Sequence, residues 1–372
     1  MQSKRLYSLD FLKFIASLLI VLHNYQGYSL ESCGIPNIDV LKYIVEFFFL
    51  LSGFFAFDYI EKIMRGTVNL KQFFSRKAKR LLPLLFVSII GYNIAISLYY
   101  TYIKPKNFKI DFWNSVLTSL GISNGWIFPD NDVYINGPTW YIAVLLLCLV
   151  VFYILTYIAK RLKITPFYFY CAVVLIGIAF VEQDLDKVFL FERSCRGYYS
   201  FFFGVILGYL IKNRKPTKLL YILSTISIIG SSLLYIFNYT KGNTVYFLTF
   251  FTFAPLIILF TSEPIVKLFD HSIFGTLGGI SFDIYVWQQP VFYTFWSILV
   301  MTGSDFDYKS VKGMILGFIL AVAFGIISYF LIEKPLNKLV DKFSGRNLLA
   351  TPRCEIAEIP NKKAEKSKRR YK

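Results

Sequence analysis

The sequence predicts an all-α, polytopic transmembrane bundle of about ten helices. Apolar residues make up 56% of the chain, and mostly apolar runs long enough to cross a bilayer recur along its length. Backbone groups in lipid must satisfy their own hydrogen bonds, so only helices or closed barrels can span it. Because these runs are continuous and do not alternate with a period of two, helices are predicted rather than barrel strands.

Ten segments have the length and apolarity expected of spans. They are residues 9–28, 41–60, 81–102, 139–158, 167–181, 197–211, 219–238, 245–261, 277–301 and 311–332. With a cytoplasmic N-terminus, 29 of the 40 Lys and Arg residues fall on the cytoplasmic side and 9 on the outer side. Basic residues collect in cytoplasmic loops, so both termini are predicted to be cytoplasmic and the chain to be multi-pass in a plasma or inner membrane.

The formal net charge of +17 has the same explanation. In a soluble protein this charge would suggest nucleic-acid binding, but the sequence contains no nucleic-acid-binding module. The concentration of basic residues in the predicted cytoplasmic loops accounts for the charge, so no nucleic-acid partner is expected.

The N-terminus resembles a signal peptide, because Lys4 and Arg5 precede an apolar run. Asp10 and Lys13 interrupt that run and no cleavage site follows, so a retained first helix is predicted. The five cysteines form no CxxC pair, which indicates neither a zinc site nor a disulfide framework. No metal is expected. Cys33 and Cys195 fall in loops predicted to lie on the same side and could pair, but nothing in the sequence favours that pairing.

Two domains are predicted. Residues 1–340 form the membrane domain, and residues 341–372 form a basic, disordered cytoplasmic tail suited to contact with an anionic lipid surface. The outer loop 103–138 is the longest loop and has the length of loops that cover cavities or contact substrates. A second outer loop, 182–196, is rich in charged residues.

Ionisable side chains inside spans are costly and are usually paired or functional. Those in the predicted spans are Asp10, Lys13, His23, Lys42, Glu46 and Asp283. Asp10 and Lys13 lie three residues apart and can pair on one helix, so a structural and a functional role are equally open. His23 lies roughly 18 Å along the helix from Phe11, near the membrane midplane, and is either a buried core histidine or a general base.

Glu46 begins the stretch "EFFFLLSGFF", which is unusual for a plain span. Its carboxylate needs a cationic partner, which Lys13 or a basic loop residue could supply. Further along this stretch, Ser52 and Gly53 suit close contact with another helix, because Gly lets backbones approach and Ser can bond across helices.

A basic cluster precedes Pro83 in "SRKAKRLLPLLF". Arg76 and Arg80 are four residues apart, so on a helix they share a face and can bind phosphate groups. The cluster is predicted to face the cytoplasm, where a phosphorylated soluble cofactor would be found.

Six sequence motifs, taken together and in their order along the chain, resemble those of the acyltransferase-3 family. Members of that family resemble bacterial polysaccharide and lipopolysaccharide O-acetyltransferases. The similarity extends over residues 5–340. The stretches that carry it are "SLDFLKFIASLLIVLH", "VEFFFLLSGFF", "RKAKRLLPLLF", "GPTWYIAVLL", "ISFDIYVWQQPV" and "LIEKPL".

The resemblance implies an O-acyltransferase that moves an acyl group, above all acetyl, from acyl-CoA to a hydroxyl of a cell-surface or lipid-linked glycan. Its implied catalytic residues are His23 as the base, Lys13 as a basic partner and Glu46 as the signature acid. The residues expected to bind acyl-CoA are Arg76, Lys79 and Arg80, and those expected to bind the acceptor are Asp10, Ser52, Trp140, Gln288 and Glu333. No permanently bound cofactor is expected. The expected partners are the acyl-CoA co-substrate, the acceptor glycan and the lipid bilayer.

Several points stay open at the level of sequence. Lys13 and His23 are ten positions apart, which leaves them about 80° apart around a helix. Either Lys13 or an arginine could stabilise the oxyanion, and His23 could act as a base or first carry the acyl group itself. Rival functions are a glycolipid or polysaccharide transporter or flippase, which would move substrate unchanged, and a polysaccharide polymerase.

Overall fold

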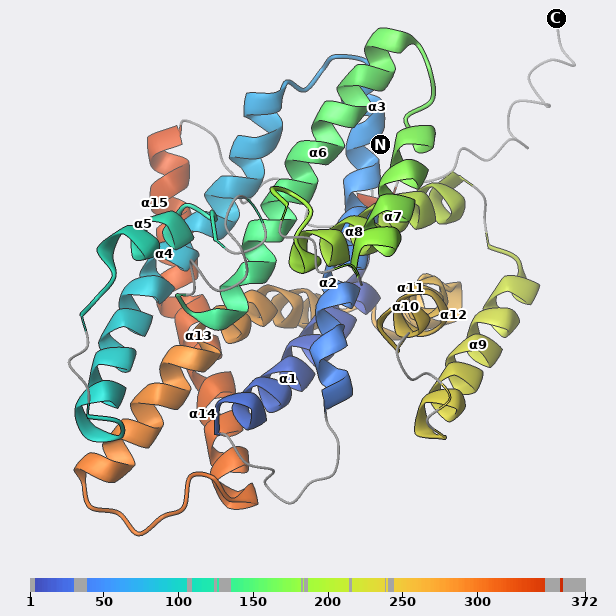
Figure 1. The fold of residues 1–372 in the computed structure, drawn as a ribbon. Coiled ribbons are helices and arrows are strands. Elements are labelled where there is room, and N and C mark those ends of the chain that lie inside the picture. The colour runs from blue at the N-terminus through green and yellow to red at the C-terminus, as the bar shows by residue number, and fades with distance from the viewer. Residues whose placement is uncertain are drawn as a thin grey trace, which may run out of the picture.

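The structure is a computed structural model, and almost all of its described chain is helical, which confirms the all-α prediction (Figure 1). The residues that it describes are 4–29, 39–105, 109–123, 126, 135–181, 183, 187–213, 216–237, 239, 244–344 and 355–356. Cys33, most of the predicted tail and parts of both predicted outer loops lie outside these residues.

The helices follow one another with short connections. The first half of the chain contains β1 (Lys4–Arg5), α1 (Tyr7–Ser29), η1 (Asp39–Tyr43), α2 (Ile44–Ala56), η2 (Phe57–Tyr59), α3 (Ile60–Met64), α4 (Leu70–Tyr102), α5 (Phe112–Ser119), η3 (Gly137–Thr139), α6 (Trp140–Leu162) and α7 (Phe167–Val181). The second half contains α8 (Glu192–Asn213), α9 (Lys218–Ile236), α10 (Thr244–Leu248), η4 (Thr249–Phe253), α11 (Ala254–Phe260), α12 (Glu263–Leu268), α13 (Ser272–Met301), α14 (Val311–Ser328), η5 (Tyr329–Glu333), α15 (Lys334–Ser344) and β2 (Glu355–Ile356). The two short strands β1 and β2 pair antiparallel.

Six helical stretches are long and apolar enough to cross a membrane, which supports a membrane protein. They are Tyr7–Tyr25, Val40–Met64, Leu70–Tyr102, Gly137–Leu162, Lys218–Ile236 and Val311–Lys342. Two shorter apolar helices cover Phe167–Val181 and Thr244–Phe260. All ten predicted spans fall on helices, while their number as membrane crossings and the cytoplasmic orientation of the termini stay predictions.

Several helices extend into, or lie within, segments predicted as loops or tail. Helix α8 starts at Glu192, within the predicted loop 182–196. Its polar first turns remain helical because Arg196 pairs with the buried carboxylate of Glu46 inside the bundle. Helix α5 lies within the predicted loop 103–138. Helix α15 continues to Ser344, past the start of the predicted tail.

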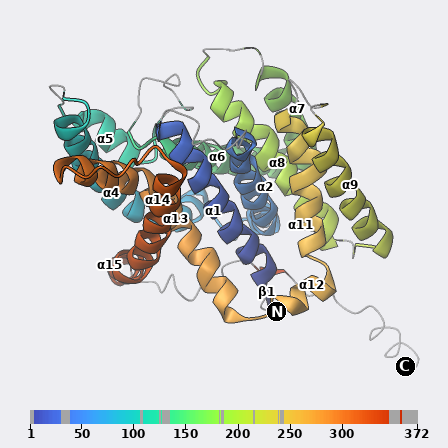
Figure 2. The ribbon, with the colours of Figure 1, turned by 90° about the horizontal axis from the view of Figure 1, so that it is seen from below.

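The bundle is organised around two groups of helices. Helix α1 packs along α13, which also contacts α4 and α14, while α8 packs against both α2 and α7. Figures 1 and 2 show α4 and α5 at one side of the bundle and α9 at the opposite side. The largest fully buried side chains are mainly aromatic, as the 19% aromatic content leads one to expect.

Helices α2 and α8 approach so closely that no side chain fits at their contact. A Cβ atom on Gly53 would overlap the carbonyl oxygen of Phe201, and one on Gly204 would overlap that of Leu50. These neighbours are backbone atoms, which cannot move aside without shifting a helix. The prediction that Gly53 permits close helix contact is therefore confirmed.

We expect Gly53→Ala to lower the free energy of unfolding by about 1–3 kcal/mol, because the added methyl group forces α2 and α8 apart. The measurement is thermal unfolding of the detergent-solubilised protein. Gly230→Ala on α9 is the matched control, since a Cβ there meets nothing within 4 Å. That control should leave stability unchanged or raise it slightly. Equal losses in both variants would contradict the role of the α2–α8 contact.

Candidate active site

One end of the bundle contains a cavity of about 1220 Å³ between α2, α4, α6 and α13. Its opening lies at the end where Arg5 contacts the start of α13, and the exposed carboxylate of Glu61 lies at its rim. The cations that line it are Lys13, Lys62, Arg76, Lys77, Arg80 and Lys212, against the carboxylates of Asp58 and Glu61. The cavity is therefore strongly basic and suits a ligand with several negative charges.

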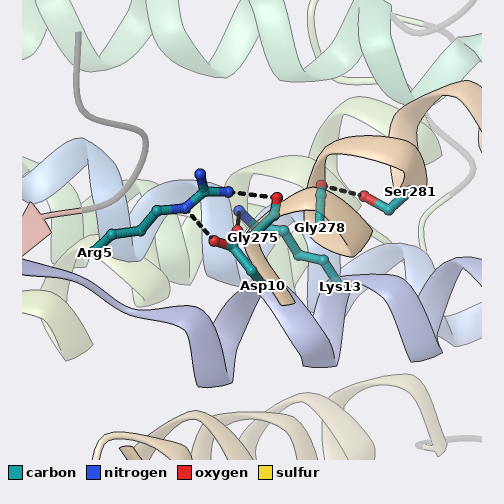
Figure 3. A network of polar contacts seen from close by, with 6 residues as sticks. All are labelled: Arg5, Asp10, Lys13, Gly275, Gly278 and Ser281. Atoms are coloured by element: carbon teal, nitrogen blue, oxygen red, sulfur yellow. Dashed lines mark hydrogen bonds and ion pairs between the residues drawn. The ribbon is translucent and has the colours of Figure 1, made fainter. Parts of the chain in front are cut away.

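Lys13 reaches the cavity wall from α1 and is held there by Asp10 (Figure 3). The Asp10 carboxylate is 1% exposed and accepts hydrogen bonds from Lys13 Nζ at 3.2 Å and Arg5 Nε at 2.6 Å. Arg5 also donates to the Gly275 carbonyl of α13. The predicted pairing of Asp10 with Lys13 is thus confirmed, and the network ties the start of α1 to α13.

Arg76 and Arg80 lie on α4 and both line the cavity, as their spacing predicts for one helix face. The helix begins at a capping box in which Asn69 and Gln72 bond each other's backbone, so the basic cluster lies in a well-formed helix start. Lys79, predicted to bind the same ligand, is absent from the described cavity wall.

The cavity becomes less charged away from its opening. Ser52 of α2 and Tyr141 of α6 line that part, and their hydroxyl oxygens lie 3.3 Å apart. Nearer the opening, Lys212 pairs with Asp58 at 2.7 Å and lies over the rings of three neighbouring phenylalanines, Phe54, Phe55 and Phe57. This pairing holds the end of α2 against the end of α8.

His23 lies further along α1, and it is not among the cavity-lining residues. The next residue, Asn24, donates a hydrogen bond to the Gln288 side chain of α13 at 3.0 Å. Gln288 follows the cavity-lining Tyr285 by three residues, or about one helical turn. The turn of α1 that carries His23 thus lies against α13 about one helical turn beyond Tyr285, whereas Lys13 lines the cavity itself.

Glu46 and Trp140 meet away from the cavity, around an arginine of α8. Arg196 Nε donates to Glu46 Oε1 at 2.5 Å, and the Glu46 side chain is fully buried. The guanidinium groups of Arg196 and Arg193 lie 5.3 and 5.4 Å from the centroid of the Trp140 ring. The arrangement combines aromatic surface with charged hydrogen-bonding groups, a combination that can contact a polar ligand.

Glu333 lies in the π-helical turn η5 and is 3% exposed. Asn337 donates a hydrogen bond to Glu333 Oε1 at 3.2 Å. Asn337 lines the cavity while Glu333 lies behind it. The predicted acceptor-binding role of Glu333 stays a prediction, and its surroundings favour a role in fixing this wall of the cavity.

Several residues of this region were not predicted from the sequence. Tyr141, Tyr285 and Lys212 line the cavity, and Arg196 is the partner of Glu46. Tyr141 follows Trp140 within the motif "GPTWYIAVLL", and that position is the one sequence feature that could have identified it as a site residue. In the sequence, Lys212 and Arg196 are distinguished only as basic residues of predicted loops. Among the described residues, no group of three or more His, Cys, Asp or Glu side chains is placed to hold a metal ion.

Comparisons with known proteins agree with the family resemblance found in the sequence motifs. A family described as an acyltransferase domain matches residues 6–333. Proteins named "Putative O-acetyltransferase" from Staphylococcus aureus strains COL and MRSA252 are each 24% identical over 364 residues, covering 89% of this chain. The chain spans somewhat over half of their length, 57%. No solved structure matches the chain.

Proposed function

The chain belongs to the acyltransferase-3 family, and on that premise we propose that it moves a short acyl group from acyl-CoA to a glycan hydroxyl. The acyl group is above all acetyl, and the glycan is at the cell surface or linked to lipid. The observation that carries the proposal is the basic cavity, whose charge suits the phosphates of a CoA thioester. The donor enters from the cytoplasmic side, where positive loop charge accumulates.

In this proposal Arg76 and Arg80 bind the CoA phosphates and the thioester extends toward Ser52 and the inner end of the cavity. Arginine suits this role because its planar guanidinium can bind phosphate oxygens with two hydrogen bonds. Asp10 acts as a positioning residue, because its two ion pairs fix Lys13 at the cavity wall. Lys13 then supplies positive charge near the reacting carbonyl.

His23 is the proposed general base. It takes the proton from the acceptor hydroxyl while the hydroxyl oxygen bonds to the thioester carbonyl carbon. The C–S bond then breaks, and the sulfur leaves with a proton as free CoA thiol, so no net proton is gained or lost. The neighbouring Asn24–Gln288 hydrogen bond supports this role, because it holds the His23 turn of α1 against α13.

Glu46, Arg196 and Trp140 form the proposed acceptor side. The Trp140 ring offers a flat apolar surface for a sugar ring, and the charged pair offers hydrogen-bonding groups. Gln288, which bonds Asn24 next to His23, is the proposed acceptor contact on α13.

The proposed function is tested by mass spectrometry of the surface glycan from a strain lacking the gene, with and without the gene restored. We expect an acetyl-sized mass to disappear from the glycan and to return on complementation. Glycan retained inside the cell with its acetyl groups would indicate a transporter instead. Shortened chains would indicate a polymerase.

Arg80→Ala is expected to raise KM for acetyl-CoA by about 10- to 100-fold, because a hydrogen bond to a charged group contributes about 1.5–3 kcal/mol. The measurement is the initial rate of labelled acetyl transfer in membrane vesicles as donor concentration varies. Arg65→Ala is the matched control, since Arg65 is 71% exposed and pairs with Glu61 on the surface. An unchanged KM in Arg80→Ala would remove Arg80 from the donor site.

A further inference from the structure

Three aromatic side chains end the cavity at the side away from its opening. On each of α2, α6 and α13, the cavity-lining residue farthest from the opening is aromatic: Phe48, Tyr141 and Tyr285, respectively. On all three helices the ring therefore lies at the end of the cavity away from its opening. Helix α2 runs toward the opening, as does α6, whereas α13 starts there at its bond with Arg5.

These three rings, called here the inner ring cluster, contact one another in every pair. The ring centroids are 6.0 Å apart for Phe48 and Tyr141, 6.2 Å for Phe48 and Tyr285, and 5.7 Å for Tyr141 and Tyr285. Aromatic pairs at such separations are in favourable contact. These three mutual contacts make the rings one packed unit on the α2, α6 and α13 side of the inner end.

Both tyrosines of the inner ring cluster are fixed at their hydroxyl groups. Tyr285 donates to the Pro138 carbonyl oxygen at 2.5 Å, and the Tyr141 hydroxyl lies 3.3 Å from Ser52 Oγ. Tyr141 also packs on Phe49, with ring centroids 4.6 Å apart. Both tyrosines are buried, so turning either ring would break a hydrogen bond and leave a buried polar group unsatisfied.

We infer that the inner ring cluster sets the maximum length of the acyl group that this protein transfers. The inference rests on the proposed function, in which the phosphates of acyl-CoA lie on Arg76 and Arg80 and the acyl group extends inward. An acyl chain that reached the cluster would have to displace anchored, close-packed rings. An extra methylene that has no room changes discrimination by about 10- to 200-fold, so a short chain is strongly selected.

The ring of Phe48 is the best one to remove, because it bears no hydroxyl and makes no side-chain hydrogen bond. Phe48→Ala opens the wall on the α2 side while Tyr141 and Tyr285 keep their anchors. Tyr141→Phe is the complementary variant, since it keeps the ring and removes only the hydroxyl. Phe57→Ala is the matched control, because Phe57 lines the same cavity near its opening.

The experiment measures kcat/KM for acetyl-CoA and for hexanoyl-CoA with membrane vesicles and the acceptor glycan. We expect the wild type to prefer acetyl by at least about 100-fold, and Phe48→Ala to reduce that ratio by at least about tenfold. The ratio should stay unchanged in Phe57→Ala. In Tyr141→Phe it should fall less than in Phe48→Ala, because that variant keeps the ring and loses only its anchor. Phe48→Leu, which is less disruptive to packing, serves in place of Phe48→Ala should the alanine variant fail to fold, and it should shift the ratio in the same direction.

The possible outcomes separate this inference from the proposed function. Acetyl transfer by the wild type together with an unchanged ratio in the folded Phe48 variants overturns the inference and leaves the proposed function standing. A wild type that uses hexanoyl-CoA as well as acetyl-CoA also overturns the inference alone. A wild type that transfers no acyl group from either donor overturns both.

Discussion

His23→Ala is expected to lower the rate of glycan acylation by about 10²- to 10⁴-fold, the range that a general base contributes. In the proposed mechanism His23 takes the proton of the acceptor hydroxyl as that oxygen attacks the thioester. Its effect should appear in kcat with little change in KM for acetyl-CoA, because the donor-binding arginines are untouched. Initial rates of labelled acetyl transfer in membrane vesicles measure both quantities.

The chain supplies its own control for this variant. His271 is the other histidine, and its exposed side chain accepts a hydrogen bond from the Ile273 backbone at the start of α13. His271→Ala should keep nearly full activity. Acylation that persists in a folded, membrane-inserted His23→Ala variant would remove His23 from the catalytic site.

Glu46→Ala is expected to lower the free energy of unfolding by about 3–5 kcal/mol, because it leaves the charge of Arg196 without its buried partner. The Glu46 side chain is fully buried and that of Arg196 is 15% exposed, so water screens the pair poorly. Acylation should also fall, since Trp140 lies over the same arginine. Thermal unfolding in detergent measures the first effect, and labelled transfer in vesicles the second.

Glu192 provides the comparison, because it is the second acid near Arg196. It lies 3.6 Å from the guanidinium and its side chain is 46% exposed. Glu192→Ala should therefore lower stability by less than about 1 kcal/mol, as exposed ion pairs do. Similar losses for Glu46→Ala and Glu192→Ala would show that burial of the Glu46–Arg196 pair is not what stabilises it.

Local features were predicted well from the sequence. Continuous apolar runs identify the helices, and a spacing of three residues identifies the pairing of Asp10 with Lys13. A spacing of four residues places Arg76 and Arg80 on one face, where both line the cavity. Lys77 and Leu81 also line the cavity, so the wall faces the side of α4 that runs from Arg80 toward Lys77. Lys79 lies on the opposite side of Arg76, so its absence from the described wall follows from helix geometry.

Contacts between distant segments could not be predicted in this way. Arg196 lies 150 residues after Glu46, and nothing in the local sequence distinguishes it from other basic residues. The inner ring cluster likewise joins three helices, so its members become neighbours only when α2, α6 and α13 pack together. Helix periodicity fixes which way a side chain points, but partner choice depends on how the helices are arranged.

The inner ring cluster also bears on how the protein insulates a membrane electrically. The cavity reaches the surface, so its interior takes nearly the potential of the solution at its opening, and the voltage drop falls across the protein between the inner ring cluster and the opposite surface. Moving one elementary charge through 100 mV changes its energy by about 2.3 kcal/mol. The inner ring cluster would therefore be the first barrier that an ion in the cavity meets, and its packed rings would help keep ions from leaking through the bundle.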